Sequence, residues 1–258
     1  MPKRASAFRP LDLLYVARKA MKQRSLAWLP VYLRDRRAFE AAGGRVTDLY
    51  PILNEFVSCA GIASGHYFHQ DLLVAQFIHS ADPRRHIDVG SRIDGFVAHV
   101  ASFRPIEVID IRPMPRSEHP NICFIQASLN VPDPALEGCS DSVSCLHVLE
   151  HLGLGRYGDP IDPEGHLKGL DNLVRMVKPG GRLYISSPIG EPRTCFNAHR
   201  IFGPGDFPKW LSRRMAVERF DYVDDAGSLH LMGDPSHLPG LKYGCGIYTF
   251  RRTDAGSP

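Results

Sequence analysis

Residues 86–95 read His-Ile-Asp-Val-Gly-Ser-Arg-Ile-Asp-Gly, and residues 106–111 read Ile-Glu-Val-Ile-Asp-Ile. The first stretch is an apolar strand that runs into a glycine turn and then a helix. The second is an apolar strand with an acid near its tip, Asp110, 22 residues after Asp88. A nucleotide-binding βαβ unit has this layout, because the turn lets backbone N–H groups approach the ligand and the acid accepts hydrogen bonds from ribose hydroxyls. The two stretches therefore predict a ligand with an adenosine-like half.

Strand and helix patterns alternate on both sides of this unit. Strands are expected at 85–89, 106–111, 122–126, 142–147 and 182–187, and helices at 69–80, 94–103 and 164–178. Near-continuous apolar strands that alternate with helices predict an α/β fold with a doubly wound, mostly parallel sheet covered on both faces. Residues 215–223 and 246–251 are expected to pair as strands at one edge of the sheet.

The positive charge of the chain is an N-terminal property. The 258 residues carry a net charge of +3, but residues 1–40 hold ten Lys and Arg against three acids, which is +7 and leaves −4 for the rest. Apolar residues at helical spacing between residues 10 and 42 predict two basic helices that Pro30 divides. The expected organisation is a helical basic extension (1–66), an α/β domain (67–251) and a tail (252–258). Residues 43–66 receive no assignment.

The cysteines and the apolar runs bear on the compartment. The six cysteines are scattered and form no C-x-x-C motif, which favours a reduced, cytoplasmic protein. No apolar run is long enough to span a bilayer, and no secretory signal is expected. The basic helices fit peripheral contact with an anionic membrane, a cap over the active site, contact with a partner, or a solvated face. No motif indicates a nucleic-acid partner.

Five motifs in this order and spacing resemble the class I S-adenosylmethionine (SAM)-dependent methyltransferase fold, which is Rossmann-like, over roughly residues 70–251. Asp88-Val-Gly90 looks like the first SAM motif, and Asp110 matches the ribose-binding acid. Three longer stretches complete the resemblance: Phe124–Ser128 as the adenine-lining segment, Asp141–Leu152 as the fourth strand with its Leu-Glu-His signature, and Val177–Ser186 as the Lys-Pro-Gly-Gly turn with the fifth strand.

The resemblance implies that SAM is the cofactor. It assigns seven residues to SAM binding: Asp88, Gly90, Arg92, Asp110, Ala127, Ser128 and His147. The chain departs from the first motif, because Arg92 and Asp94 stand where the next two glycines are usual and Gly95 comes one residue late. Two interpretations remain open: Arg92 pairs with the carboxylate of the amino-acid tail, or it fills the pocket and prevents binding.

Four further stretches are similar to a poorly characterised bacterial methyltransferase-like family that is often associated with cell-surface polysaccharide genes. They are Tyr67–Asp71, Asp88–Phe96, Gly153–Pro163 and Asn197–Phe202. This second resemblance implies an acceptor that is a small molecule or resembles a carbohydrate, but it supplies no established substrate.

The candidate catalytic and acceptor-binding residues follow the fourth and fifth strands. His151 is the first candidate for a general base, since an imidazole titrates near neutral pH, and His199 is the second. Glu150, Arg156, Tyr157 and Asp159 are candidates for acceptor binding. The competing structural interpretations are that Glu150 and His151 only shape the SAM pocket, that residues 153–163 are an ordered surface loop, and that Asn197 caps a helix.

The leading functional prediction is SAM-dependent methyl transfer, and two alternatives stay open. The altered glycine motif favours a non-catalytic relative that binds a ligand or partner in a polysaccharide assembly. His147, Glu150 and His151 also spell H-x-x-E-H, a zinc-hydrolase pattern, which requires both histidines on one helix face and a further ligand. Because His147 falls at a strand end, no metal site is expected.

Overall fold

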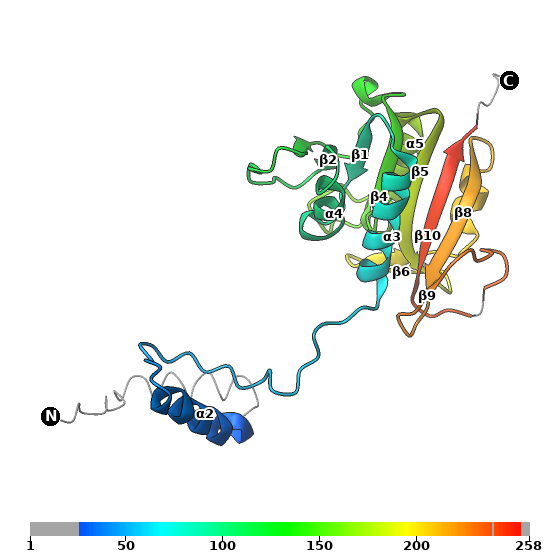
Figure 1. Cartoon of the computed structure of the whole chain (residues 1–258). Coiled ribbons are helices and arrows are strands. Elements are labelled where there is room, and N and C mark those ends of the chain that lie inside the picture. The colour runs from blue at the N-terminus through cyan, green and yellow to red at the C-terminus, as the bar shows by residue number, and fades with distance from the viewer. Residues whose placement is uncertain (1–25, 239, 254–258) are drawn as a thin grey trace. The chain divides into compact units, whose positions relative to one another are not determined.

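The computed structural model describes residues 26–238 and 240–253 (Figure 1). These residues form two compact units that divide between Ile62 and Ala63. The first unit holds a 3-10 turn, η1 (Leu26–Trp28), and a helix, α2 (Leu29–Ala41). Pro30 lies in the first turn of α2, where its missing N–H costs no hydrogen bond. The predicted helix ahead of Pro30 falls mostly on residues 1–25, outside the described residues.

The second unit contains the predicted α/β domain. Its helices and helical turns are α3 (His66–Ala81), η2 (Ile93–Val97), α4 (Ala98–Ala101), η3 (Pro134–Leu136), η4 (Leu149–His151), α5 (Gly165–Met176) and α6 (Asp206–Leu211). Its strands are β1 (His86–Val89), β2 (Ile106–Asp110), β3 (Ile122–Gln126), β4 (Ser140–Leu146), β5 (Val177–Ile189), β6 (Arg193–Cys195), β7 (His199–Ile201), β8 (Met215–Val223), β9 (Leu229–His230) and β10 (Gly244–Arg252). None of the described helices is both long and apolar enough to cross a membrane.

Eight of these strands form one sheet in the order β3-β2-β1-β4-β5-β10-β8-β9. Strands β1 to β5 are parallel, and β10 lies antiparallel between β5 and β8. The predicted mostly parallel, doubly wound sheet is therefore confirmed. The chain order reverses between β1 and β4, which is the point where open α/β sheets bind ligands at the carboxyl ends of their strands.

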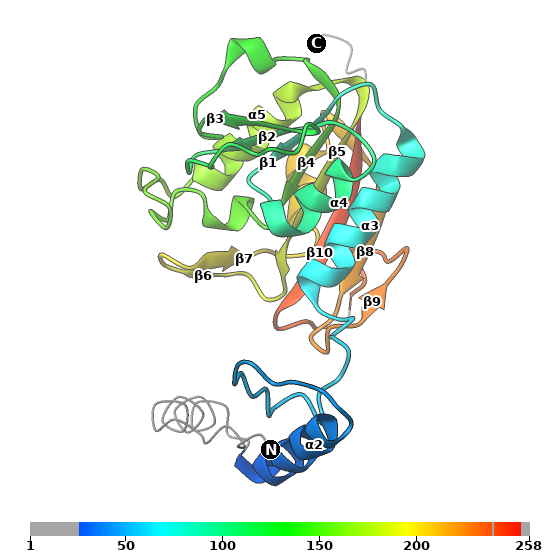
Figure 2. The same ribbon diagram turned by 60° about the vertical axis from the view of Figure 1, so that its left-hand side comes forward.

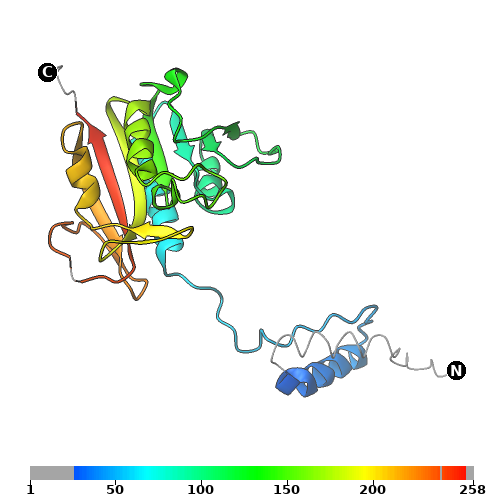
Figure 3. The same cartoon turned by 180° about the vertical axis from the view of Figure 1, so that it is seen from behind.

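Helices cover both faces of the sheet. Figure 2 shows α3 and α4 on one face, and Figure 3 shows the opposite face with α5. On the first face, Val74 and Ile78 of α3 and Val100 of α4 pack with strand residues such as Val108. On the second face, Leu173 of α5 and Phe207 of α6 belong to the other apolar core. Burial on both faces explains why the central strands are apolar almost throughout.

The predicted elements differ from the structure mainly at their ends. The predicted helix at 94–103 is interrupted, because Gly95 has non-helical φ and ψ of −123° and −107°, so a π-helical turn precedes the short α4. Strands β8 and β10 pair as predicted, but β10 also pairs with β5 and is interior to the sheet. It continues to Arg252, one residue into the predicted tail, and residues 254–258 lie outside the described residues.

Candidate functional site

The turn after β1 starts at Gly90. Its φ of +74° lies in the left-handed region that favours glycine. A Cβ at this position would lie 2.9 Å from the Val148 side chain. The Gly90 N–H donates to the Ile109 carbonyl over 2.8 Å, which ties the turn to the end of β2. The turn therefore leaves a bare backbone at the carboxyl edge of the sheet.

Asp88 lies beneath this turn and is fully buried. Its carboxylate accepts hydrogen bonds from the Ser91 N–H at 3.0 Å, the Ser91 hydroxyl at 2.7 Å and the Ser144 hydroxyl at 2.6 Å. The sequence predicted that Asp88 binds SAM, but in the structure its carboxylate accepts hydrogen bonds from the turn and from β4. Burial raises the pKa of Asp88 to about 6, although the hydrogen bonds from Ser144 and Ser91 lower it.

The raised pKa of Asp88 predicts a pH-dependent contribution to stability. Because the folded protein binds this proton more tightly than the unfolded chain, the contribution is present below the unfolded pKa of 3.8 and is lost as pH rises through about 6. We expect the free energy of unfolding of the native protein, relative to Asp88→Asn, to fall by about 1 kcal/mol between about pH 5 and about pH 7. Urea denaturation of both proteins at each pH measures this difference. If the free energy of unfolding depended on pH in the same way for both proteins, the raised pKa of Asp88 would be contradicted.

Arg92 does not fill the pocket. Its side chain is 56% exposed, pairs with Asp94 over 3.1 Å, and places its guanidinium 5.3 Å from the centre of the Tyr67 ring. Gly95, which comes one residue later than the usual glycine, has a packing role. A Cβ at this position would lie 2.6 Å from a carboxylate oxygen of Asp71 on α3. The altered motif thus allows α3 to approach the turn.

A pocket lies at the carboxyl ends of β1, β2 and β3, with roughly 450 Å³ of empty space including its open mouth. Seven of the predicted site residues line it: Gly90, Asp110, Ala127, Ser128, His151, Tyr157 and Asp159. The other predicted site residues (Asp88, Arg92, His147, Glu150, Arg156 and His199) do not line this pocket.

Asp110 ends β2 at the pocket wall and is held by Arg112. The Arg112 guanidinium donates to both carboxylate oxygens, at 3.0 and 2.6 Å, and the Arg112 N–H donates to one of them at 2.8 Å. The guanidinium also lies 4.7 Å from the centre of the Tyr157 ring. Arg112 thus contacts both the Asp110 carboxylate and the Tyr157 ring. A ribose that binds Asp110 must displace the Arg112 guanidinium from at least part of the carboxylate.

His151 is the titratable ring on the pocket wall. Its Nδ1 lies 2.7 Å from the Ala198 carbonyl oxygen, which accepts, so Nδ1 carries the proton and Nε2 is the basic nitrogen. Nε2 lies 3.7 Å from a Glu150 carboxylate oxygen. Burial lowers the pKa of His151, and Arg156 and His147 lower it further, against Glu150 and the Ala198 carbonyl, which raise it. The ring is therefore neutral and able to accept a proton at neutral pH.

Internal hydrogen bonds hold the loop at residues 153–163 in one conformation. The buried Asp159 carboxylate accepts from the Gly153 N–H at 2.6 Å and from the Tyr157 N–H at 3.3 Å. Buried Arg200 donates to the carbonyls of Leu152 at 2.6 Å and Pro163 at 3.2 Å, at the two ends of the loop. Asp159 therefore orders the loop although it was predicted to bind the acceptor.

His147 follows β4 with a φ of +55° and faces a second cluster. Its Nδ1 lies 2.8 Å from a Glu150 carboxylate oxygen. Burial lowers the pKa of His147, but Cys245 and Glu150 together raise it well above its usual value. The H-x-x-E-H interpretation fails geometrically, because within the described residues His147 groups with His66 and Cys245 at metal-ligand spacing, and not with His151.

His199 begins β7 and contacts Tyr243, with 5.4 Å between ring centres. Asn197 does not cap a helix. It lies in the turn between β6 and β7 with a φ of +61°, and Cys195 and His199 pair across that turn. Asparagine is one of the few residues that tolerates this conformation.

Sequence reasoning missed three residues of the site: Arg112, His66 and Cys245. Arg112 carries a local signal, because an arginine two residues after an acid that ends a strand can reach its carboxylate. His66 and Cys245 carry none, since α3 and the long-range pairing of β10 bring them to His147. A histidine before an amphipathic helix and a cysteine in a strand are ordinary in isolation.

No curated protein shows a significant sequence match to the chain. Residues 135–226 match the family model described as a Caenorhabditis protein of unknown function, DUF268. The N-methyltransferase NodS from Bradyrhizobium japonicum WM9, solved with S-adenosyl-L-homocysteine, is similar with a TM-score of 0.51 and 16% identity over 73% of this chain and 88% of that chain.

A second solved structure is the 1,6-didemethyltoxoflavin-N1-methyltransferase of Burkholderia thailandensis, with bound 1,6-didemethyltoxoflavin and S-adenosylhomocysteine. It has a TM-score of 0.52 and 15% identity over 98% of this chain and 94% of that chain. The fold is accordingly that of the class I SAM-dependent methyltransferases, as the sequence predicted.

Proposed function

We propose that this protein transfers a methyl group from SAM to a small-molecule or carbohydrate-like acceptor. The observation that supports the proposal most is the pocket, which gathers Gly90, Asp110, Ala127 and Ser128 from the ends of three successive strands. These are the positions at which the fold binds an adenosine-like ligand. They come from separate parts of the sequence, so their meeting in one pocket does not follow from any single motif.

The residues present fit SAM. The bare backbone at Gly90 gives room for close approach, and the Asp110 carboxylate is placed to accept hydrogen bonds from ribose hydroxyls. Ala127 and Ser128 present a small, mostly apolar wall to the adenine. Arg92 is exposed beside the turn, where its guanidinium is available to the carboxylate of the amino-acid tail. SAM supplies an electrophilic methyl group on a sulfonium.

His151 serves as the general base for a hydroxyl acceptor. Its protonated Nδ1 is fixed by the Ala198 carbonyl, so Nε2 accepts the proton that the acceptor loses. Glu150 stabilises the imidazolium that forms, from 3.7 Å. The ring lines the same pocket as Gly90 and Asp110, which brings the base to the cofactor end of the site.

Tyr157 and two arginines form the acceptor side. The guanidinium groups of Arg112 and Arg156 lie 4.7 and 5.3 Å from the Tyr157 ring centre, and the ring meets His151 edge-on at 5.7 Å. An aromatic ring beside two cations suits an acceptor with a flat or sugar-like face and an anionic group. The resemblance to a family associated with polysaccharide genes supports the carbohydrate class.

The non-catalytic alternative depended on Arg92 and the displaced glycine. Because Arg92 lies outside the pocket and Gly95 packs against α3, neither residue favours a closed cofactor site. The zinc hydrolase of the H-x-x-E-H pattern is not favoured, because within the described residues His147 and His151 do not meet as one group of metal ligands.

Calorimetric titration of the full chain with SAM, and separately with S-adenosylhomocysteine, tests the proposal. We expect one site per chain with micromolar affinity for both ligands, because both share the adenosine and amino-acid parts that the pocket residues contact. NAD is the matched control, since it carries the same adenosine but a pyrophosphate in place of the amino-acid tail. Absence of binding by both sulfur ligands, or equal binding of NAD, would overturn the proposal.

A further inference from the structure

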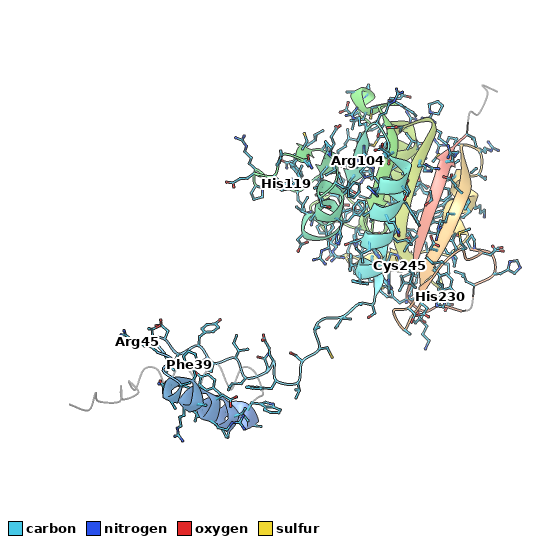
Figure 4. All side chains as sticks on the ribbon, in the orientation of Figure 1. Phe39, Arg45, Arg104, His119, His230 and Cys245 are labelled. Carbon is cyan, nitrogen blue, oxygen red and sulfur yellow. The ribbon has the colours of Figure 1, made fainter. Side chains whose placement is uncertain are left out.

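Three side chains from distant parts of the sequence meet at the N-terminal end of α3. They are His66, the first residue of α3, His147, which follows β4, and Cys245 of β10. One ligand atom from each lies within 4.8 Å of the other two. Figure 4 labels Cys245 beside the first turns of α3. The three side chains therefore form a cluster of two imidazoles and one thiol, which no sequence motif predicted.

His147 is oriented for a ligand on its free nitrogen. The Glu150 carboxylate holds Nδ1 at 2.8 Å, and the Glu150 side chain is 1% exposed. The His147 side chain is 6% exposed, yet its Nε2 is buried with no hydrogen-bond partner among the described residues. A buried polar atom without a partner costs free energy, so its persistence needs an explanation. Metal-binding histidines commonly donate their other ring nitrogen to a carboxylate in this way.

Cys245 and His66 also lack strong competing partners. The buried Cys245 sulfur has two weak contacts, to the Gln70 side-chain oxygen at 3.8 Å and to the Gly246 carbonyl at 3.7 Å. The His66 ring lies between His147 and Tyr243, with ring centres 5.5 and 5.3 Å away. Within the part of the chain that the structure describes, neither side chain makes another short hydrogen bond to a side chain that a metal would have to break.

We propose that His66, His147 and Cys245 bind one zinc ion, with Glu150 positioning His147 through Nδ1. Imidazole nitrogen and thiolate sulfur are the ligands that zinc prefers, at about 2.0–2.3 Å from the metal. Ligand atoms at these distances lie within about 4 Å of one another, so small side-chain rotations close the cluster on the ion. The thiol of Cys245 releases its proton when the sulfur binds the metal. Three protein ligands leave a fourth position open, as in catalytic zinc sites.

The cluster adjoins the cofactor pocket along the backbone that follows β4. His147 directly precedes Val148, which lines that pocket. His66 is only partly buried, and Tyr243 and Tyr67, which contact His66 and His147, are exposed, so the cluster lies near the surface. The open position therefore takes a water molecule or an oxygen, nitrogen or sulfur donor of a small ligand. The site stands independently of methyl transfer, because none of its three ligands lines the cofactor pocket.

Metal loading of the full chain tests the site. The purified protein is stripped with a chelator, reloaded with Zn²⁺ and assayed for bound zinc by mass spectrometry and by competition with a chromophoric chelator. We expect one zinc per chain in the wild type and a loss of affinity of more than about 100-fold in Cys245→Ala and His66→Gln. Glu150→Gln is expected to lose about 10–100-fold, as other carboxylates behind metal-binding histidines do.

Cys145→Ala and His166→Gln are the matched controls, because Cys145 is also fully buried in the sheet and His166 is also partly buried, but neither belongs to the cluster. Both should keep full zinc affinity. Replacement of zinc by Co²⁺ in the wild type should give a near-ultraviolet thiolate-to-cobalt absorption band, which reports a cysteine ligand in the native protein even where a variant fails to fold, and Cys145→Ala should keep this band. No zinc after loading, equal zinc in Cys245→Ala and Cys145→Ala, or no thiolate band would overturn the proposal.

Discussion

Asp110→Ala is expected to weaken SAM binding by at least about 100-fold while the protein stays folded. The carboxylate lies on the pocket wall at the end of β2, where the ribose hydroxyls of an adenosine-like ligand are expected to bind. Each hydrogen bond to a charged group contributes about 1.5–3 kcal/mol, so two of them account for 100-fold or more in affinity. Calorimetry gives the affinity, and thermal unfolding checks the fold.

Arg112→Ala is the matched control for this prediction. It removes the two hydrogen bonds that the Arg112 guanidinium donates to the Asp110 carboxylate but leaves the carboxylate and the bond from the Arg112 backbone N–H in place. SAM affinity should therefore hold or increase, because the ribose no longer competes with the guanidinium. Equal losses in both variants would mean that the ion pair shapes the pocket and that Asp110 does not contact the ribose.

Gly153→Ala is expected to lower the free energy of unfolding by up to about 5 kcal/mol. The residue has a φ of +76°, and an added Cβ would lie 1.9 Å from the backbone oxygen of Asp162, so the loop itself must move. A non-glycine residue in this conformation costs about 1–2 kcal/mol, and overpacking costs about 1–3 kcal/mol more. The shift would also break the Gly153 N–H bond to Asp159.

Gly158→Ala separates the two causes, because Gly158 has a similar φ of +79° but open space around its Cβ position. It should cost only the conformational part, about 1–2 kcal/mol. Urea denaturation of both variants gives the difference. Equal losses of unfolding free energy in the two variants would show that the Asp162 backbone moves at little cost. The loop would then not be the fixed structure that its hydrogen bonds indicate.

The central fold was predictable because buried parallel strands carry a strong signal. The predicted strand at 122–126 coincides with β3, and the predicted strand at 215–223 coincides with β8. The helix at 94–103 was predicted as one continuous helix, because Phe96, Val97 and Val100 follow helical spacing. All three side chains are indeed buried, but the helix is interrupted at Gly95. The break at Gly95 arises from close packing against Asp71 on α3, which periodicity does not report.

The site was predictable where it depends on strand ends. Asp110 and Ser128 follow successive parallel strands, so their meeting at one edge follows from the topology. Asp88 was assigned to SAM by its motif, whereas its bond to Ser144 depends on how β1 and β4 pair. The cluster of His66 and Cys245 with His147 depends on where β10 inserts, which no local pattern encodes.

The position of β10 has a consequence for how the chain acquires its structure during synthesis. This strand follows β8 and β9 in sequence but lies between β5 and β8 in the sheet. While the chain leaves the ribosome, β5 has an open edge and β8 has no partner connecting it to the parallel strands. Non-local pairing of this kind forms slowly, and open strand edges invite aggregation. Final assembly of the sheet therefore waits for residues 244–252, and the edge of β5 stays open until this segment has been synthesised.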